Sequence, residues 1–108
     1  MLRLKEGDTA LPINGKITSA AAGNPPRDLT GCTVVATLVA ADTREILLSR
    51  PVAIVDATGG AWRLDWQDGE TSRPGKYFLE ISVTFPDGHV AHAPTDGFLT
   101  VLIEQALA

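Results

Sequence analysis

The 108-residue sequence has little of what several large classes of protein depend on. Its single cysteine, Cys32, cannot form an internal disulfide, so a hydrophobic core must hold the fold together. No apolar run approaches the roughly 20 residues that a helix needs to span a bilayer. The nine basic residues are scattered and the net charge is −4, which argues against a nucleic-acid surface. We therefore expect neither a membrane nor a nucleic acid among its partners.

Motifs that carry catalytic or cofactor chemistry are also scarce. The two histidines, His89 and His92, are three residues apart, so on a strand they point to opposite faces and cannot easily share a metal ion. The sequence has no Gly-x-Ser-x-Gly elbow and no phosphate-binding glycine loop. Asp65, Asp68 and Glu70 cluster without the ligand spacing of an EF-hand. We expect no catalytic residues, no cofactor and no metal site.

What the sequence does contain is alternation of apolar and polar residues. The clearest case is residues 76–85, where five large apolar side chains alternate with mostly polar ones. This is the period of a half-buried strand. A turn signal follows at residues 86–88 (PDG), and residues 89–93 run back beside the strand. Leu79, Ile81 and Val83 are predicted to lie at the centre of the core.

The same pattern along the whole chain predicts an all-β protein. Turn signals recur about every 8–12 residues, which favours an Ig-like antiparallel Greek-key β-sandwich of about seven to nine short strands. Residues 1–103 are predicted to form one domain and residues 104–108 a C-terminal tail. Residues 67–74 have capping residues that could support one helical turn. The expected strands are residues 1–5, 9–18, 32–40, 45–49, 52–55, 61–66, 76–85, 89–93 and 98–103.

The longest predicted loop is a candidate partner contact. It follows residues 9–18, which Pro12 and Lys16 mark as an edge strand, and it is proline-rich and has no apolar anchor. Loops of this length are usually functional or disordered. We expect this loop and the tail to be mobile in the free protein and to become ordered at a subunit contact. The loop residues are Ser19, Ala20, Ala21, Ala22, Gly23, Asn24, Pro25, Pro26, Arg27 and Asp28.

Trp62 and Trp66 share one face of a predicted strand, with Leu64 between them. Two exposed indole rings at this spacing could stack on sugars, which would make the domain a carbohydrate-binding module. The other interpretation is that these three residues form the core face of the strand, because exposing all of them would create a large apolar patch. Large apolar residues are mostly buried, which favours the core.

Several turns and strand starts are similar to those of a known family. Residues 28–34 (DLTGCTV) resemble a D-L-T-G-A-T-V strand start, residues 74–78 (PGKYF) a P-G-x-Y start, and residues 85–88 (FPDG) an F-x-D-G hairpin. Residues 7–9 (GDT) precede an extended segment in the same way. Nearly the whole chain thus resembles the Ig-like N-terminal domain of phage baseplate upper proteins and similar small tail proteins of phages and prophages.

The resemblance implies a structural role without catalytic residues. It implies a virion protein made in the host bacterial cytoplasm, which docks onto other virion proteins and onto itself in a ring around the tail axis. Baseplate, neck and tail positions fit equally well. A carbohydrate-binding module using Trp62 and Trp66 is the alternative, and a small hydrolase using Asp65 and Glu70 is a third reading.

Overall fold

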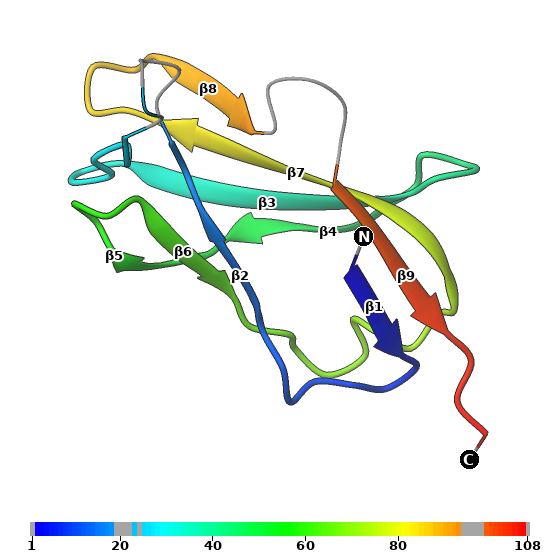
Figure 1. The fold of residues 1–108 in the computed structure, drawn as a ribbon. Helices are drawn as coiled ribbons and strands as arrows, with labels where there is room; N and C mark the ends of the chain where they lie inside the picture. The colour runs from blue at the N-terminus through cyan, green and yellow to red at the C-terminus, as the bar shows by residue number, and fades with distance from the viewer. Residues whose placement is uncertain (1, 19–22, 24, 94–98, 108) are drawn as a thin grey trace.

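The computed structural model describes residues 2–18, 23, 25–93 and 99–107. Within these residues the chain forms nine strands and no helix (Figure 1). The strands are β1 (Leu2–Lys5), β2 (Ile13–Lys16), β3 (Thr33–Ala40), β4 (Ile46–Pro51), β5 (Ala53–Asp56), β6 (Ala61–Leu64), β7 (Gly75–Thr84), β8 (Val90–Ala93) and β9 (Leu99–Glu104).

The strands make two sheets. The larger sheet has the order β1-β9-β7-β3-β4, with β8 also paired to β7, and the smaller sheet has the order β2-β6-β5. All the pairs are antiparallel except β1 with β9, which run parallel. The chain changes sheet between β1 and β2, between β2 and β3, between β4 and β5, and between β6 and β7 (Figure 1). The predicted all-β, Ig-like β-sandwich is confirmed.

The core lies between the sheets and is built from alternate residues of the central strands. On β7, Leu79, Ile81 and Val83 are at most 1% exposed, as predicted. Burying one such side chain is worth about 1.5–3 kcal/mol relative to leaving it in water. Their direct partners on β3 are the buried residues Leu38, Ala36 and Val34.

Tyr77 fixes the start of β7. Its buried ring packs in the core, and its hydroxyl donates a 2.6 Å hydrogen bond to the carbonyl oxygen of Arg73, four residues upstream. A tyrosine that ties the chain back in this way at the start of a strand is the tyrosine corner of Ig-like sandwiches. The hydrogen bond satisfies the one polar atom of a side chain that is otherwise apolar.

Two segments differ from the sequence-based expectation. Residues 67–74 form turns rather than a helical turn. The predicted tail begins later than expected, because Glu104 belongs to β9 and pairs with Lys5 of β1. Beyond it, the N–H of Ala106 donates to a carboxylate oxygen of Glu6 at 3.2 Å. The start of the tail is therefore tied to the N-terminal part of the domain.

Candidate functional site

An apolar cleft opens on one side of the sandwich, between β2 and the edge of the larger sheet that β1 and β9 form. Its volume is about 430 Å3, within the range of about 300–1,000 Å3 that is usual for binding sites. Among the described residues that line it, Lys16 alone is charged. The lining residues are Leu2, Ile13, Asn14, Gly15, Lys16, Ile17, Trp62, Ile81, Ala93 and Leu99.

β2 borders this cleft with its main chain. Five consecutive residues, 13–17, line the cleft. Because successive side chains of a strand point to opposite faces, a hollow that touches all five must lie along the edge of the strand. Among the described strands β2 pairs with β6 alone. We call the other side of β2 its open edge.

The hydrogen-bonding pattern between β2 and β6 identifies the main-chain groups that lie on the open edge. The N–H of Ile17 donates to the carbonyl oxygen of Gly60 at 2.8 Å, toward the β6 side. The register between β2 and β6 has no shift. Since residues of an antiparallel pair alternate between hydrogen-bonded and non-hydrogen-bonded positions, Asn14 and Lys16 direct their N–H and C=O groups away from β6. These groups lie along the open edge.

Two inward-facing leucines of the larger sheet are poorly covered beside the cleft. Leu99 lies on the same face of β9 as Val101 and Ile103, which are at most 1% exposed, yet Leu99 is 42% exposed. Leu2 pairs directly with Val101 and is 39% exposed. The smaller sheet has three described strands, whereas the matching sheet of a constant-type Ig sandwich has four. The fourth position is next to β2, where a strand would cover both leucines.

Trp62 reaches the cleft because position 15 has no side chain. Gly15 is the direct partner of Trp62 in the β2–β6 pair, and a Cβ atom at position 15 would overlap the indole ring. The ring therefore lies against the main chain of β2. Its Nε1–H is buried and has no hydrogen-bond acceptor among the described residues. Buried indole N–H groups usually find an acceptor.

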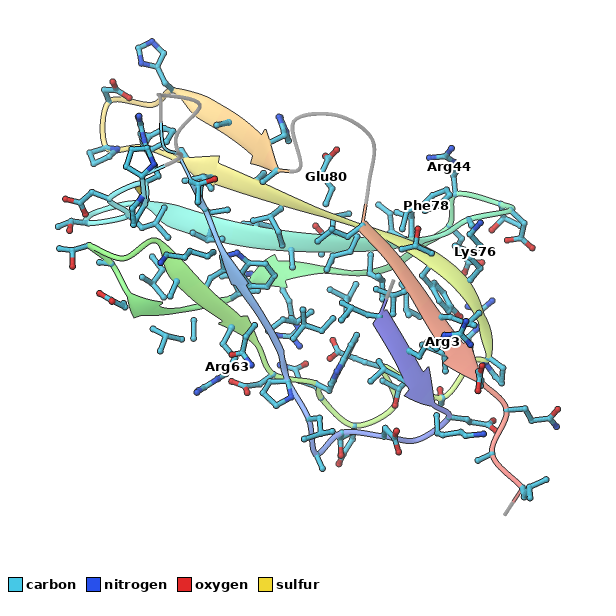
Figure 2. The ribbon with its side chains drawn as sticks, viewed as in Figure 1. Arg3, Arg44, Arg63, Lys76, Phe78 and Glu80 are labelled. Atoms are coloured by element: carbon cyan, nitrogen blue, oxygen red, sulfur yellow. The ribbon has the colours of Figure 1, made fainter. Side chains whose placement is uncertain are left out.

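The sugar-stacking interpretation of Trp62 and Trp66 is wrong. Their side chains are only 3% and 7% exposed, and both belong to the core together with Leu64. A stacking platform must present ring faces to solvent, and these rings are covered. Arg63 and Asp65, the alternate residues of this segment, point outward instead and form a 3.0 Å ion pair. Figure 2 shows Arg63 projecting away from the sheets.

The predicted partner-contact loop begins where β2 ends. Arg27 is held in place, because its N–H donates to the carbonyl oxygen of Ile17 at 2.9 Å and its guanidinium lies 4.6 Å from the ring centroid of Phe85. Asp28 accepts a 2.6 Å hydrogen bond from the hydroxyl of Thr30. The last residues of the loop thus have polar contacts although the loop has no apolar anchor, and its mobility in the free protein stays a prediction. Ser19, Ala20, Ala21, Ala22 and Asn24 lie outside the described residues, whereas Gly23, Pro25, Pro26, Arg27 and Asp28 are exposed.

Glu70, one of the clustered acidic residues, has a structural role. It forms a 2.7 Å ion pair with Arg50, and both side chains are largely buried. Arg50 also donates to the main-chain oxygen of Asp65, and the N–H of Gln67 donates to Glu70 at 2.6 Å. Burial by itself would raise the pKa of Glu70, but the hydrogen bonds from Arg50 and Gln67 hold it below its ordinary value. The pair ties the turn after β6 to β4.

The histidines lie on the hairpin that joins β7 to β8 and on β8 itself. Nδ1 of His89 is 2.8 Å from a carboxylate oxygen of Asp87. Hydrogen bonds from the main chain and the side chain of His89 lower the pKa of Asp87. His92 is exposed on β8. In the described part of the chain, no three His, Cys, Asp or Glu side chains gather as they would around a metal ion, and no helix is long and apolar enough to cross a membrane.

The outer face of the larger sheet carries a second apolar feature, the ring of Phe78. Figure 2 shows Phe78 and Glu80 on the side of β7 that faces away from the smaller sheet. The guanidinium of Arg44 lies 5.0 Å and the ammonium of Lys76 lies 5.7 Å from the centroid of the Phe78 ring. Cations at these distances are attracted to the ring and cover it. The cleft is therefore the better candidate for a binding site.

Comparison with known proteins supports the fold and nothing finer. Neither the protein families nor the curated proteins that were compared match the sequence. Among solved structures, the chain is similar to the crystal structure of CopC from Methylosinus trichosporium OB3b, with a TM-score of 0.54 and 10% sequence identity. The similarity covers 99% of this chain and 86% of that chain. At this identity the likeness concerns the fold alone.

Sequence reasoning placed an edge strand at β2 but did not find the cleft beside it. One local signal was present, because a glycine inside a strand, here Gly15, often marks the close approach of another group. No local signal identifies Leu2 and Leu99 as exposed. Their exposure depends on which strands face them across the sandwich, and those strands are distant in sequence.

Proposed function

We propose that this domain is a structural assembly module that acts through protein–protein contacts in a phage or prophage virion, as a baseplate, tail or neck component. The observation that carries the proposal is the open side of the sandwich, by which we mean the open edge of β2 together with Leu2 and Leu99. An unpaired strand edge beside uncovered apolar side chains is the kind of surface that a partner protein covers.

The virion setting rests on the resemblance of residues 28–34, 74–78 and 85–88 to the phage family. The roles of the chemically suggestive residues favour a non-catalytic module as well. Glu70 is engaged by Arg50, and the two tryptophans fill the core. The partners we propose are other virion proteins and further copies of this chain arranged as a ring.

The test is the composition of virus particles. If the gene lies among genes for capsid, portal or tail proteins, purified particles should contain this protein at a fixed ratio to the tail proteins, as measured by quantitative mass spectrometry. A gene position inside a sugar-utilisation operon, or absence of the protein from the particles, would contradict the proposal.

A pair of variants separates the open side from the rest of the surface. Leu99→Asp places a charge beside the cleft, and Ile46→Asp places the same charge on β4, where Ile46 is 62% exposed. We expect Leu99→Asp to prevent incorporation into particles and Ile46→Asp to leave it unchanged. Circular dichroism of both purified variants should match the parent, because both positions are exposed.

A further inference from the structure

We infer that the open side binds an extended segment of a partner protein as a fourth strand of the smaller sheet, hydrogen-bonded to the open edge of β2. This inference rests on the proposed assembly function and names the form of the partner. Addition of a strand to a sheet edge is a recurring mode of protein recognition, in which the main chain supplies affinity and alternate side chains supply specificity.

The main chain of β2 offers the hydrogen bonds that such a strand needs. Asn14 and Lys16 occupy non-hydrogen-bonded positions of the β2–β6 pair, so they direct two N–H donors and two C=O acceptors toward the open edge. The cleft follows residues 13–17, which span about 15 Å at the usual rise of about 3.3 Å per residue. A strand of ordinary length therefore fits beside β2.

The shape of the cleft favours a strand over a compact small molecule. The hollow extends along consecutive main-chain positions of β2 and reaches Leu2 and Leu99 on the facing sheet. Alternate side chains of an added strand would point toward these leucines. The cleft thus has the two surfaces that a strand inside a sandwich contacts, a sheet edge beside it and an apolar sheet face opposite.

The lining of the cleft defines the chemistry of the partner segment. Its inward side chains are apolar, to cover Leu2 and Leu99. Lys16 is exposed on the outer face of β2, so an acidic residue on the outward face of the segment complements it. The indole of Trp62 is buried against the main chain of Gly15, so an added strand would change its surroundings without contacting its N–H group.

The test uses the full chain with a probe strand tethered to its N-terminus. The probe has about seven residues. Valine occupies its inward positions, and threonine its outward positions, except for an aspartate at the centre. This pattern reads the same from both ends, so the probe can pair with β2 in either direction. A Gly/Ser linker of about ten residues has an end-to-end distance of about 17 Å. This distance is enough to place the probe beside β2, because Leu2, next to the N-terminus, itself lines the cleft. We expect amide exchange at Lys16 to slow about tenfold or more relative to the untethered chain, with a shift of the Trp62 indole N–H resonance.

Two proline variants make the test specific. Asn14→Pro removes an N–H from the open edge without removing a β2–β6 hydrogen bond, and should abolish the protection of Lys16. Val90→Pro is the matched control on the edge strand β8. The N–H of Phe85 donates to the oxygen of His89, so the N–H of Val90 points away from β7. Val90→Pro should leave the protection unchanged.

Two results would overturn the inference. The first is unchanged exchange at Lys16 in the tethered chain, and the second is protection that survives Asn14→Pro. If the first result comes together with a shift of the Trp62 indole signal on adding the apolar dye anilinonaphthalene sulfonate, the cleft is assigned to small molecules. If the protein is found in particles while the tethered strand fails, the inference falls and the assembly function stands. If the tethered strand binds but the protein is absent from particles, the strand site stands and the virion setting is contradicted.

Discussion

Single side chains on β7 show how burial divides this protein into a core face and an outer face. Leu79 is completely buried, whereas its neighbour Glu80 is half-buried on the outer face. We expect Leu79→Ala to lower the free energy of unfolding by about 2–5 kcal/mol, the sum of the lost transfer energy and the cavity left behind. Urea unfolding followed by circular dichroism measures this change.

Glu80→Ala is the matched control, and its cost should stay within about 0.5 kcal/mol. If Leu79→Ala cost less than about 1 kcal/mol, the assignment of the core face of β7 would be wrong.

The ion pair between Glu70 and Arg50 makes a prediction about pH. The pKa of Glu70 is lowered in the folded protein from the ordinary value of 4.5. A lowered pKa contributes stability above the ordinary value, and that contribution is lost as the pH falls through the lowered one. We expect Glu70→Gln to cost about 1–3 kcal/mol at pH 7, where it removes a hydrogen-bonded charge. The cost should shrink as the pH is lowered below 4.5.

Urea unfolding of both proteins across this pH range measures the difference. Asp87→Asn is the control, because Asp87 also has a lowered pKa but is exposed. A cost of Glu70→Gln that stayed constant down to the most acidic pH would show that the carboxylate charge does not stabilise the fold.

At the scale of elements, the pairing of β2 with β6 depends on Gly15. A methyl group at this position would overlap the indole of Trp62, so the ring or the strand must move. We expect Gly15→Ala to lower the free energy of unfolding by about 1–3 kcal/mol, as overpacking does in other cores. The tryptophan emission should shift to longer wavelength, because the ring becomes more accessible to water.

Asn14→Ala is the control for this substitution, since Asn14 is the exposed neighbour on the same strand. Unchanged stability and unchanged emission in Gly15→Ala would mean that the Trp62 ring does not lie against β2.

The existence of each strand could be predicted from the sequence because alternation is a local property. All nine expected segments contain a strand, and the predicted edge position of β2 is also found. The ends were harder to place, because they depend on distant partners. β9 continues to Glu104 since Lys5 of β1 pairs with it there, and nothing near Glu104 in the sequence indicates this.

The candidate site could be predicted only in part. The sequence left two interpretations of Trp62 and Trp66, and packing between the sheets decides for the core. The sequence shows no apolar anchor in the loop, but the N–H of Arg27 bonds the carbonyl oxygen of Ile17, a contact that forms only when folding brings these segments together. The bond from Thr30 to Asp28 is local, between residues two apart. The cleft itself arises from an unfilled strand position, which no local pattern encodes.

At the scale of the whole molecule, the two sheets are unequal. The larger has six strands and the smaller three among the described residues, so part of the larger sheet faces no strand. The uncovered part lies next to the open edge of β2, which places main-chain hydrogen-bonding groups and apolar side chains on one side of the molecule. Under the assembly function that we propose, each contact at this side would complete a sheet.

The most direct test of strand addition at the open side is amide hydrogen exchange, read by mass spectrometry, on the free protein and on the same protein incorporated in particles. We predict that exchange in residues 13–17 slows strongly on incorporation, because a partner strand hydrogen-bonds the open edge of β2. Exchange on the outer face of β4, around Ile46, should change little. Unchanged exchange at residues 13–17, with protection confined to another face, would contradict strand addition at the open side.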